Sequence, residues 1–426
     1  MSTLLFASFV IIIILGAPIA VSLGLSSMTA IYLGTNLPLA LIPQRMYAAA
    51  DSFPLMAIPF FMLAGALMEY GGISRRLINL ADKLVGHLTG GLALVGIITC
   101  MFFAAISGSG PATVAAIGGI MIPSMVRAGY DESFSSAVMA IAGSIGVIIP
   151  PSIPMVTYGV VAGASIGAIF MGGIAAGVVV GLSLMIMAYY ISKKRGYGGT
   201  SEKFSLKEFL IALKEAFWAI LMPVIILGGI YGGIFTPTEA AAVAVAYGFV
   251  IGLFVYKELS FKGLPKILVN AAVSTATVMI IIASASVFGW ILTSERIPDT
   301  IAKSFMALTN SPVMFMLLIN FMLLIVGTFM ETNAAIIILA PIFLPLAVQL
   351  GINPIFFGVI VVVNLAIGMV TPPLGVNLFV ACGIQKISIE KISKAVLPFI
   401  VANVIALLIL TFVPDIIMFL PSVLLK

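Results

Sequence analysis

Charged residues are scarce in this sequence. They make up 8% of its 426 residues, against 62% hydrophobic residues, whereas a soluble domain carries about 25% charged residues. The mean hydropathy is +1.27, and apolar runs recur along the whole chain. Such a chain has too few charged residues to form a water-exposed surface, and no stretch of it resembles a separate soluble domain. The composition therefore predicts an all-α polytopic membrane protein that sits in a lipid bilayer.

Cysteine and histidine are nearly absent as well. Cys100 and Cys382 lie far apart in apolar runs, so neither a disulfide framework nor a metal-binding spacing is predicted. The single histidine, His87, lies in an amphipathic segment, and the apolar spans cannot supply a set of serine, histidine and aspartate. We expect neither enzyme activity nor a cofactor. The net charge of +5 does not indicate nucleic-acid binding, because the basic residues follow the membrane topology described below.

Two segments, 107–154 and 329–376, carry the same helix breakers at an offset of 222 positions. Each copy contains an apolar span that is interrupted by two consecutive prolines. Coincident prolines in one window predict an internal duplication, and paired interrupted helices in corresponding halves mark the binding site of a transporter. The matching pairs are Pro123 and Pro345, Gly129 and Gly351, Gly146 and Gly368, Pro150 and Pro372, and Pro151 and Pro373.

The duplication organises the rest of the chain into two repeats. Residues 1–191 form the first repeat, with a helical hairpin at 91–127 and a broken helix at 132–170. Residues 192–215 are a polar linker. Residues 216–426 form the second repeat, with a hairpin at 311–350 and a broken helix at 354–384. Outside these features the expected helices include 3–15, 18–33, 37–51, 53–70, 73–88, 172–191, 217–235, 240–256, 261–270, 271–293 and 396–420.

The arms of the first hairpin are too short to cross the membrane. Each apolar arm has 15 residues, 92–106 and 112–126, which is about 22 Å of helix against a hydrocarbon core of roughly 30 Å. A re-entrant hairpin fits this length better than two spans. Each repeat then crosses the membrane an odd number of times, so the second repeat is inverted relative to the first.

The basic residues assign an orientation to this inverted arrangement. Sixteen of the 20 Lys and Arg residues fall on the side of the linker, and only Arg45, Arg296, Lys303 and Lys426 fall on the other side. The positive-inside rule then places the linker in the cytoplasm and both termini outside. The first hairpin enters from the cytoplasm and the second from outside, so their tips are expected to meet near the midplane beside the two broken helices.

The meeting point has the chemistry of a small-cation site. Hairpin tips and proline breaks leave carbonyl groups without helical partners, and such backbone is tolerated at membrane depth only where it lines a cavity or is buried in protein. Together with hydroxyl groups these carbonyls form cages of hard oxygen ligands. The predicted cation ligands are Ser107, Gly108, Gly110, Ser144 and Gly146 in the first copy and Thr328, Glu331, Thr332, Gly368 and Thr371 in the second.

The same place suits an anionic substrate. The half-helices that start after each tip and each break direct their N-termini, with partial positive charge, into one space. The hairpin arms and the breaks contain no basic residue, so backbone N–H groups and polar side chains are expected to hold the anion. The predicted substrate-binding residues are Ser109, Gly110, Pro151, Ser152, Asn333, Pro373 and Asn377.

Structural roles remain open for several of these residues. Glu331 is an intramembrane carboxylate, which indicates function by default, but it also stands where a helix cap is needed. The Ser-Gly tip at 107–110 could serve close helix packing, and the Pro-Pro pairs could be plain kinks. Glu239, in the sequence Thr236-Pro237-Thr238-Glu239, reads as a helix cap rather than as a transport residue.

The motifs resemble those of a known family. The sequences F-P-L-M-A-I-P-F-F-M-L at 53–63, G-G-I-S-R-R-L at 71–77 and S-G-S-G-P-A-T at 107–113, together with 143–154 and 371–377, are similar to the large membrane subunit of tripartite ATP-independent periplasmic (TRAP) transporters, within the ion-transporter superfamily. The resemblance covers essentially the whole chain. It implies a bacterial inner-membrane protein whose elevator-type mobile domain holds sodium at the hairpin tips and broken helices.

The resemblance also implies partners and a function. A small four-helix membrane subunit would brace the scaffold, and a soluble periplasmic binding protein would deliver an organic acid such as a sialic acid or a C4-dicarboxylate. The expected function is sodium-driven uptake of that acid. A sodium/dicarboxylate symporter of the same superfamily that needs no binding protein is the alternative within transport. A structural or channel-like membrane scaffold is the alternative from another class.

Overall fold

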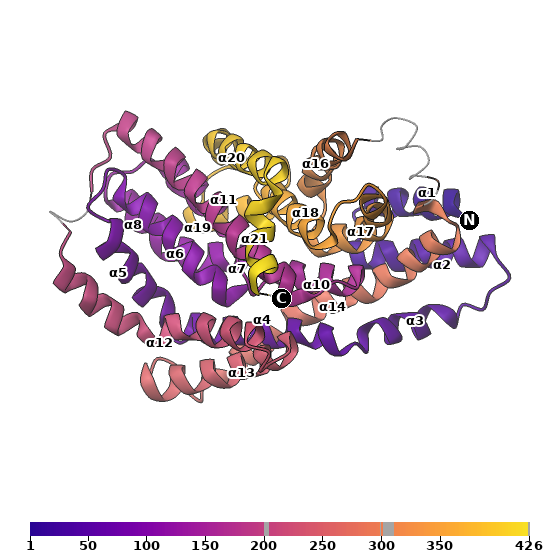
Figure 1. Cartoon of the computed structure of the whole chain (residues 1–426), viewed down its shortest axis with the longest axis horizontal. Helices are drawn as coiled ribbons and strands as arrows, with labels where there is room; N and C mark the ends of the chain where they lie inside the picture. Colours follow the sequence, from indigo (N-terminus) through magenta and orange to yellow (C-terminus); the bar gives the residue numbers. More distant parts are fainter. Residues whose placement is uncertain (200–203, 299, 301–310, 425–426) are drawn as a thin grey trace.

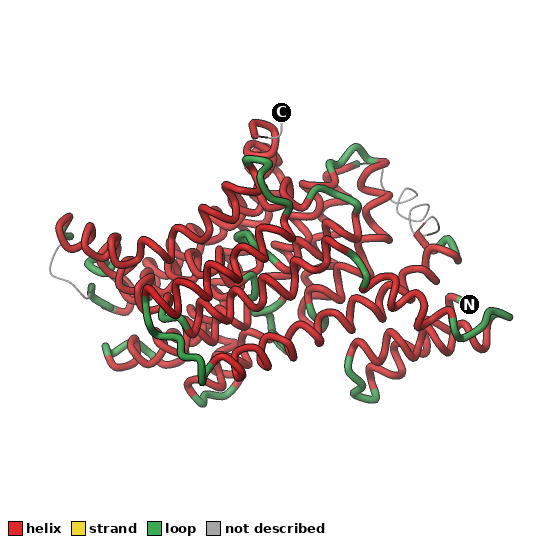
Figure 2. Tube along the Cα trace, turned by 90° about the horizontal axis from the view of Figure 1, so that it is seen from below, coloured by secondary structure: helices red, strands yellow, loops and turns green. Residues whose placement is uncertain are grey.

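The computed structural model describes residues 1–199, 204–298, 300 and 311–424. Within these ranges the chain is helical and contains no strand, as Figures 1 and 2 show. Lys203, Lys303 and Lys426, which belong to the charge count above, lie outside the described residues. By length and composition, eight of the described helices are able to cross a membrane. The prediction of an all-α polytopic membrane protein is confirmed.

The first half begins with helices at one end of the molecule and continues to a hairpin in the opposite half (Figure 1). Its elements are α1 (Ser2–Ile14), α2 (Ile19–Gly34), α3 (Leu41–Ala50), η1 (Phe53–Met56), α4 (Ala57–Tyr70), α5 (Ile73–Val85), α6 (Gly91–Ser107), α7 (Gly110–Thr113), η2 (Val114–Gly118), α8 (Gly119–Arg127), α9 (Glu132–Ser144), η3 (Ile145–Val147), α10 (Ile153–Ala162) and α11 (Ile166–Arg195).

The second half repeats the order of a hairpin followed by a helix that breaks at two prolines. Its elements are α12 (Leu206–Tyr231), α13 (Pro237–Val250), η4 (Ile251–Val255), α14 (Leu264–Ser294), α16 (Pro312–Phe329), α17 (Thr332–Gln349), α18 (Pro354–Gly368), α19 (Val376–Gln385), α20 (Ile389–Phe412) and α21 (Pro414–Leu424). Both Pro-Pro bonds, Pro150–Pro151 and Pro372–Pro373, are cis. The helices α11 and α12 extend into the predicted linker from either side.

Helix starts follow the local capping chemistry. The side chain of Thr236 accepts a hydrogen bond from the backbone N–H of Glu239, and Glu239 Oε2 accepts one from the N–H of Thr236 at 2.8 Å. This is the reciprocal capping box that the sequence predicts. Ser311 and Asn353 also cap the helices that begin with Pro312 and Pro354. The interpretation of Glu239 as a cap is confirmed.

Three expected helix boundaries were wrong. The segments 261–270 and 271–293 form one helix, α14, because the only proline there lies in its first turn, where a missing N–H costs nothing. The segment 396–420 is two helices, because Pro414 cannot continue α20. The second part of the broken helix expected over 132–170 ends at Ala162, where Gly163 takes a left-handed conformation (φ +61°) and stops it.

The second arm of the first hairpin is also less regular than expected. Its central turn, η2, is a π-helix, and Pro123 lies inside α8. A π-turn is common at functional sites, where it displaces backbone groups from regular pairing. The second hairpin has two regular arms, α16 and α17, although α17 contains Pro341 and Pro345.

The broken helices exchange partners between the two halves. Before its break, α9 packs against α6, α7 and η2 of its own hairpin, but after the break α10 packs against α17 of the second hairpin. Likewise α18 packs against α16, whereas α19 packs against α9 and η2 of the first half. Figure 1 shows α7, α10 and α18 near the centre of the molecule, with α12 and α13 along its lower edge and α1, α2 and α3 at one end. The exchange brings both hairpin tips to one place.

Candidate functional site

Both hairpin tips and both helix breaks line one cavity of about 120 Å³. The first tip contributes 108–111 and the second 330–333. The breaks contribute Val147, Ile153, Pro154, Met369 and Val376. The convergence that the sequence predicts for the tips and the breaks is therefore present in the structure.

Oxygen atoms cluster at the first tip. Ser107 Oγ lies 2.8 Å from Thr113 Oγ1, and Thr113 Oγ1 donates a hydrogen bond of 2.7 Å to the carbonyl oxygen of Ser109. Ser109 also caps α7, because its side chain accepts the N–H of Ala112. The loop from 107 to 109 joins α6 to α7, so one short turn gathers three oxygen atoms that belong to two hydroxyl groups and a carbonyl.

Two glycines allow the neighbouring chain to approach this cluster. A Cβ atom on Gly146 would lie 2.5 Å from Thr113 Oγ1 and 2.6 Å from the Ser109 carbonyl oxygen. Gly108 has φ +62°, and a Cβ there would lie 2.8 Å from the carbonyl oxygen of Pro151. Glycine is required at both positions because any side chain would displace backbone atoms. The tip thus packs directly on η3 and the first proline break.

The second tip is built around Glu331. Its carboxylate caps α17 by accepting the N–H of Ala334 at 3.0 Å, and its Oε1 accepts a hydrogen bond of 2.8 Å from Asn333 Nδ2. The cap that the sequence left open as an alternative is therefore present, and it does not exclude a role in binding. Thr332 Oγ1 is buried and has no hydrogen-bond partner among the described residues. An unsatisfied buried oxygen of this kind suits a cation ligand.

Polar contacts across the two halves join the tips to the exchanged helices. Thr157 Oγ1 on α10 lies 3.0 Å from Asn333 Oδ1, which can accept its hydrogen bond. Asn377 on α19 donates from Nδ2 to the carbonyl oxygen of Ala140 at 3.1 Å. Its Oδ1 has no partner among the described residues, and a Cβ on Gly110 would lie 3.2 Å from it. Each tip therefore faces a half-helix from the other half of the chain.

The predicted site residues fall into three groups: those that line the cavity, those that contact its first tip or cap α10, and those that do neither. Six of them line the cavity, namely Gly108, Ser109, Gly110, Glu331, Thr332 and Asn333. Ser107, Gly146, Pro151 and Asn377 contact the first tip, as described above. Ser152 caps α10 by accepting the N–H of Met155 and donates to the carbonyl oxygen of Val147 at 2.6 Å.

The remaining predicted residues are not among those that line the cavity. Ser144 is fully buried and donates to the carbonyl oxygen of Ile141 at 2.7 Å. Thr328 donates to the carbonyl oxygen of Ile325 in its own helix, and Thr371, which follows the end of α18, donates to the carbonyl oxygen of Ile367. Gly368 packs against Gly327, and Pro373 is exposed. Each hydroxyl oxygen keeps lone pairs that remain available to a cation, so the predicted roles of these residues remain predictions.

Sequence reasoning missed Thr113, Thr157 and the apolar wall of the cavity. Thr113 lies four residues after Ser109, a helical spacing that could have revealed it. Thr157 had no such signal, because its partner Asn333 lies 176 residues away. Met62 on α4 and Val278 on α14 complete the wall, and only the tertiary structure brings them there.

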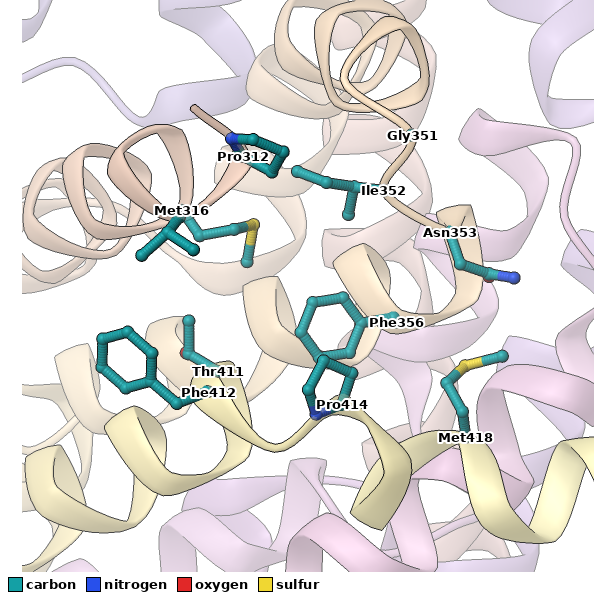
Figure 3. Close-up of a pocket in the computed structure, with 11 residues that line it drawn as sticks. Pro312, Met316, Gly351, Ile352, Asn353, Phe356, Thr411, Phe412, Pro414 and Met418 are labelled. Atoms are coloured by element: carbon teal, nitrogen blue, oxygen red, sulfur yellow. The ribbon is translucent and has the colours of Figure 1, made fainter. Parts of the chain in front are cut away.

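A larger pocket of about 300 Å³ lies elsewhere, between the start of α16, the loop before α18 and the junction of α20 with α21. Figure 3 shows Met316, Phe356, Phe412 and Met418 around this pocket, with Thr411 at its edge. Its lining is predominantly apolar, and it contains none of the residues predicted to hold a cation or an anion. The tip cavity, although smaller, is the better candidate for those ligands.

Three comparisons relate the chain to known proteins. Residues 6–416 match the family model of the tripartite ATP-independent periplasmic transporter, DctM component. The chain is 54% identical to the isethionate TRAP transporter permease protein DctMQ of Oleidesulfovibrio alaskensis over 97% of its own length, and it spans 65% of the length of that relative. It is 44% identical to the C4-dicarboxylate TRAP transporter large permease protein DctM of Pseudomonas aeruginosa, with 94% of each chain covered.

The chain is also similar to a sialic acid transporter subunit and to a solved transporter structure. The sialic acid TRAP transporter large permease protein SiaM of Vibrio cholerae is 40% identical over 96% of this chain and 95% of the relative. The crystal structure of the YdaH transporter of Alcanivorax borkumensis has a TM-score of 0.63, with 88% of this chain and 87% of that chain covered, at 16% identity. At that identity the match supports the fold alone.

Proposed function

The chain belongs to the DctM component family of tripartite ATP-independent periplasmic transporters, and from this premise we propose that it catalyses sodium-driven uptake of an organic acid across the bacterial inner membrane. Such a protein moves a solute and is not an enzyme. A small membrane subunit and a periplasmic binding protein would act with it, and the binding protein would deliver the acid. An elevator movement of the hairpins and broken helices would carry the bound acid across.

One observation carries the proposal: the cavity lined by both tips and both breaks. Sodium would bind to the oxygen cluster formed by Ser107, the Ser109 carbonyl and Thr113. It would also bind to the second tip, where Thr332 Oγ1 has no partner in the described part of the chain and Glu331 supplies negative charge. Hard oxygen ligands favour such an ion. Among the described residues there is no cluster of His, Cys, Asp and Glu that would favour a transition metal instead.

The anionic end of the substrate would lie between the two tips. Gly110 and Thr332, the first residues of α7 and α17, line this region, and Asn333 and Ser109 supply polar side chains. A carboxylate or a sulfonate presents the same acceptor oxygens to such groups. The relatives named for isethionate, C4-dicarboxylates and sialic acid all have anionic substrates, which supports an organic acid without choosing one.

Reconstitution tests the proposal directly. The chain alone in liposomes should show little uptake of radiolabelled succinate, isethionate or sialic acid. Addition of the small subunit, the binding protein and an inward sodium gradient should produce saturable uptake of one of them. Full uptake by the chain alone would favour the sodium/dicarboxylate symporter instead. A flux that neither saturates nor requires sodium would contradict secondary transport.

A further inference from the structure

A second polar recess, of about 580 Å³, shares no lining residue with the tip cavity. It is formed by the start of α5, the first half of α12 and the residues that follow η4. Arg75, Arg76 and Lys214 line it together with Trp218 and Tyr256. None of these residues takes part in the proposed transport site, so the recess requires a separate explanation.

Arg76 and its neighbours form a rigid wall of this recess. Its guanidinium group donates to the carbonyl oxygen of Gly72 and to Glu258 Oε1, each at 2.7 Å, and lies 3.7 Å from the centre of the Tyr256 ring. Glu258 is therefore neutralised locally. A fixed guanidinium with two acceptors and an aromatic ring is ordered before any ligand arrives.

Two other cations of the recess remain available. Arg75 and Lys214 are exposed, and neither belongs to an ion pair within the described part of the chain. The remaining carboxylate, Glu215, accepts a hydrogen bond from Asn79 at 3.3 Å. The recess thus has an excess of positive charge on side chains that can reach toward a ligand.

Apolar and aromatic side chains border these cations. Trp218 is 39% exposed and Val255 is 41% exposed within the recess, and their neighbours Phe217 and Phe254 are 50% and 62% exposed. A basic group beside exposed Trp and Tyr is the pattern of a membrane–water interface. The charge count of the sequence assigns the ends of α5, α12 and η4 to the cytoplasmic side, where the leaflet contains anionic lipids.

We propose that this recess binds the phosphate group of an anionic phospholipid of the inner leaflet. Arg75 and Lys214 donate charge-assisted hydrogen bonds to the phosphate oxygens, while Trp218 and Val255 contact the glycerol and the upper part of an acyl chain. A free phosphate would use the two cations but would gain nothing from the exposed apolar border. The border therefore favours the lipid.

Native mass spectrometry of the full chain in detergent tests this inference. Dioleoyl phosphatidylglycerol should remain bound to the wild type more tightly than dioleoyl phosphatidylcholine. The double variant Arg75→Gln/Lys214→Gln should lose affinity for phosphatidylglycerol by roughly thirty-fold, since each basic residue near the surface contributes about 1 kcal/mol. The control Lys193→Gln/Lys194→Gln removes the same charge from exposed positions at the end of α11 and should leave the affinity unchanged.

Three results would overturn the proposal. The first is equal retention of the two lipids by the wild type. The second is an equal loss in the test and control variants, which would indicate a diffuse charge effect rather than a site. The third is displacement of phosphatidylglycerol by an equimolar amount of glycerol 3-phosphate, which would assign the recess to a soluble phosphate. A further variant, Trp218→Ala, should weaken lipid retention without altering the charge.

Discussion

At the scale of single residues, the tip cavity depends on glycines. Because a glycine has no side chain, the neighbouring segment can approach the oxygen atoms of the tip closely. Gly146 lets η3 approach the Ser109 carbonyl and Thr113, and Gly110 lets Asn377 approach the start of α7. In each case a Cβ atom would occupy the space beside an oxygen atom. Small residues therefore shape the proposed ion and substrate sites as much as the polar residues do.

Gly146→Ala should weaken sodium activation of uptake. The new methyl group would lie 2.5 Å from Thr113 Oγ1 and 2.6 Å from the Ser109 carbonyl oxygen, so the oxygen cluster must open. Overpacking of this kind costs about 1–3 kcal/mol, which corresponds to a rise in the half-activating sodium concentration of about fivefold to 150-fold. Sodium-dependence curves of the reconstituted transporter measure it.

The matched control is Gly119→Ala on α8, where a Cβ would meet nothing within 4 Å. It should leave the sodium curve as in the wild type. Identical curves for Gly146→Ala and the wild type would show that the first cation site lies elsewhere.

Thr157→Val should loosen the link between the second tip and α10. Valine keeps the shape of threonine but leaves Asn333 Oδ1 without the hydroxyl that lies 3.0 Å from it, at a cost of about 1–2 kcal/mol. We expect a lower melting temperature in detergent and a higher half-saturating substrate concentration. Thr277→Val removes an exposed hydroxyl that bonds only within α14 and should change neither quantity. If both variants behave alike, the contact between the halves has no energetic role.

At the scale of elements, the hairpins are held against the broken helices by close backbone packing. Gly327 on α16 faces Gly368 on α18, and a Cβ on Gly368 would lie 2.5 Å from backbone atoms of Gly327. Gly65 on α4 similarly faces the backbone of Ser107. Without a hydrophobic driving force between helices in lipid, such close contact is a main source of helix association.

Gly368→Ala should therefore destabilise the second hairpin. The methyl group would push α16 away from α18, and we expect a loss of about 1–3 kcal/mol of unfolding free energy, visible as a lower melting temperature. Gly383→Ala, at an exposed helical position with no atom within 4 Å of the added Cβ, should be neutral or slightly stabilising. A melting temperature for Gly368→Ala equal to that of Gly383→Ala would contradict the packing argument.

At the scale of the whole molecule, orientation rests on the distribution of Lys and Arg. Sixteen of these 20 residues fall on one predicted side. A reporter fused after Lys194 should be cytoplasmic, and one fused after Lys426 should be outside the cytoplasm. Alkaline phosphatase and fluorescent-protein fusions distinguish the two compartments. Both reporters on the same face would rule out the inverted repeat.

The sequence by itself determined the class of protein and the position of most elements. Breakers and capping residues act over a few neighbours, so the capping box at Thr236, the hairpin turns and the two Pro-Pro breaks could be predicted from local chemistry. The duplication added long-range information, because the same breakers occur twice. The division of 261–293 at 270–271, where the sequence has no breaker, was wrong, since nothing there ends α14.

Only the tertiary structure shows which elements of one half contact which elements of the other half. The exchange of α10 and α19 between the hairpins places Thr157 beside Asn333 and Asn377 beside Gly110. The sequence predicted that the tips and the breaks converge, but it assigned each cation site to the tip and the break of one copy, because periodicity and capping do not specify contacts between residues more than a hundred positions apart. Those contacts follow from how the helices pack to bury their shared surface, which depends on the shape of the whole bundle.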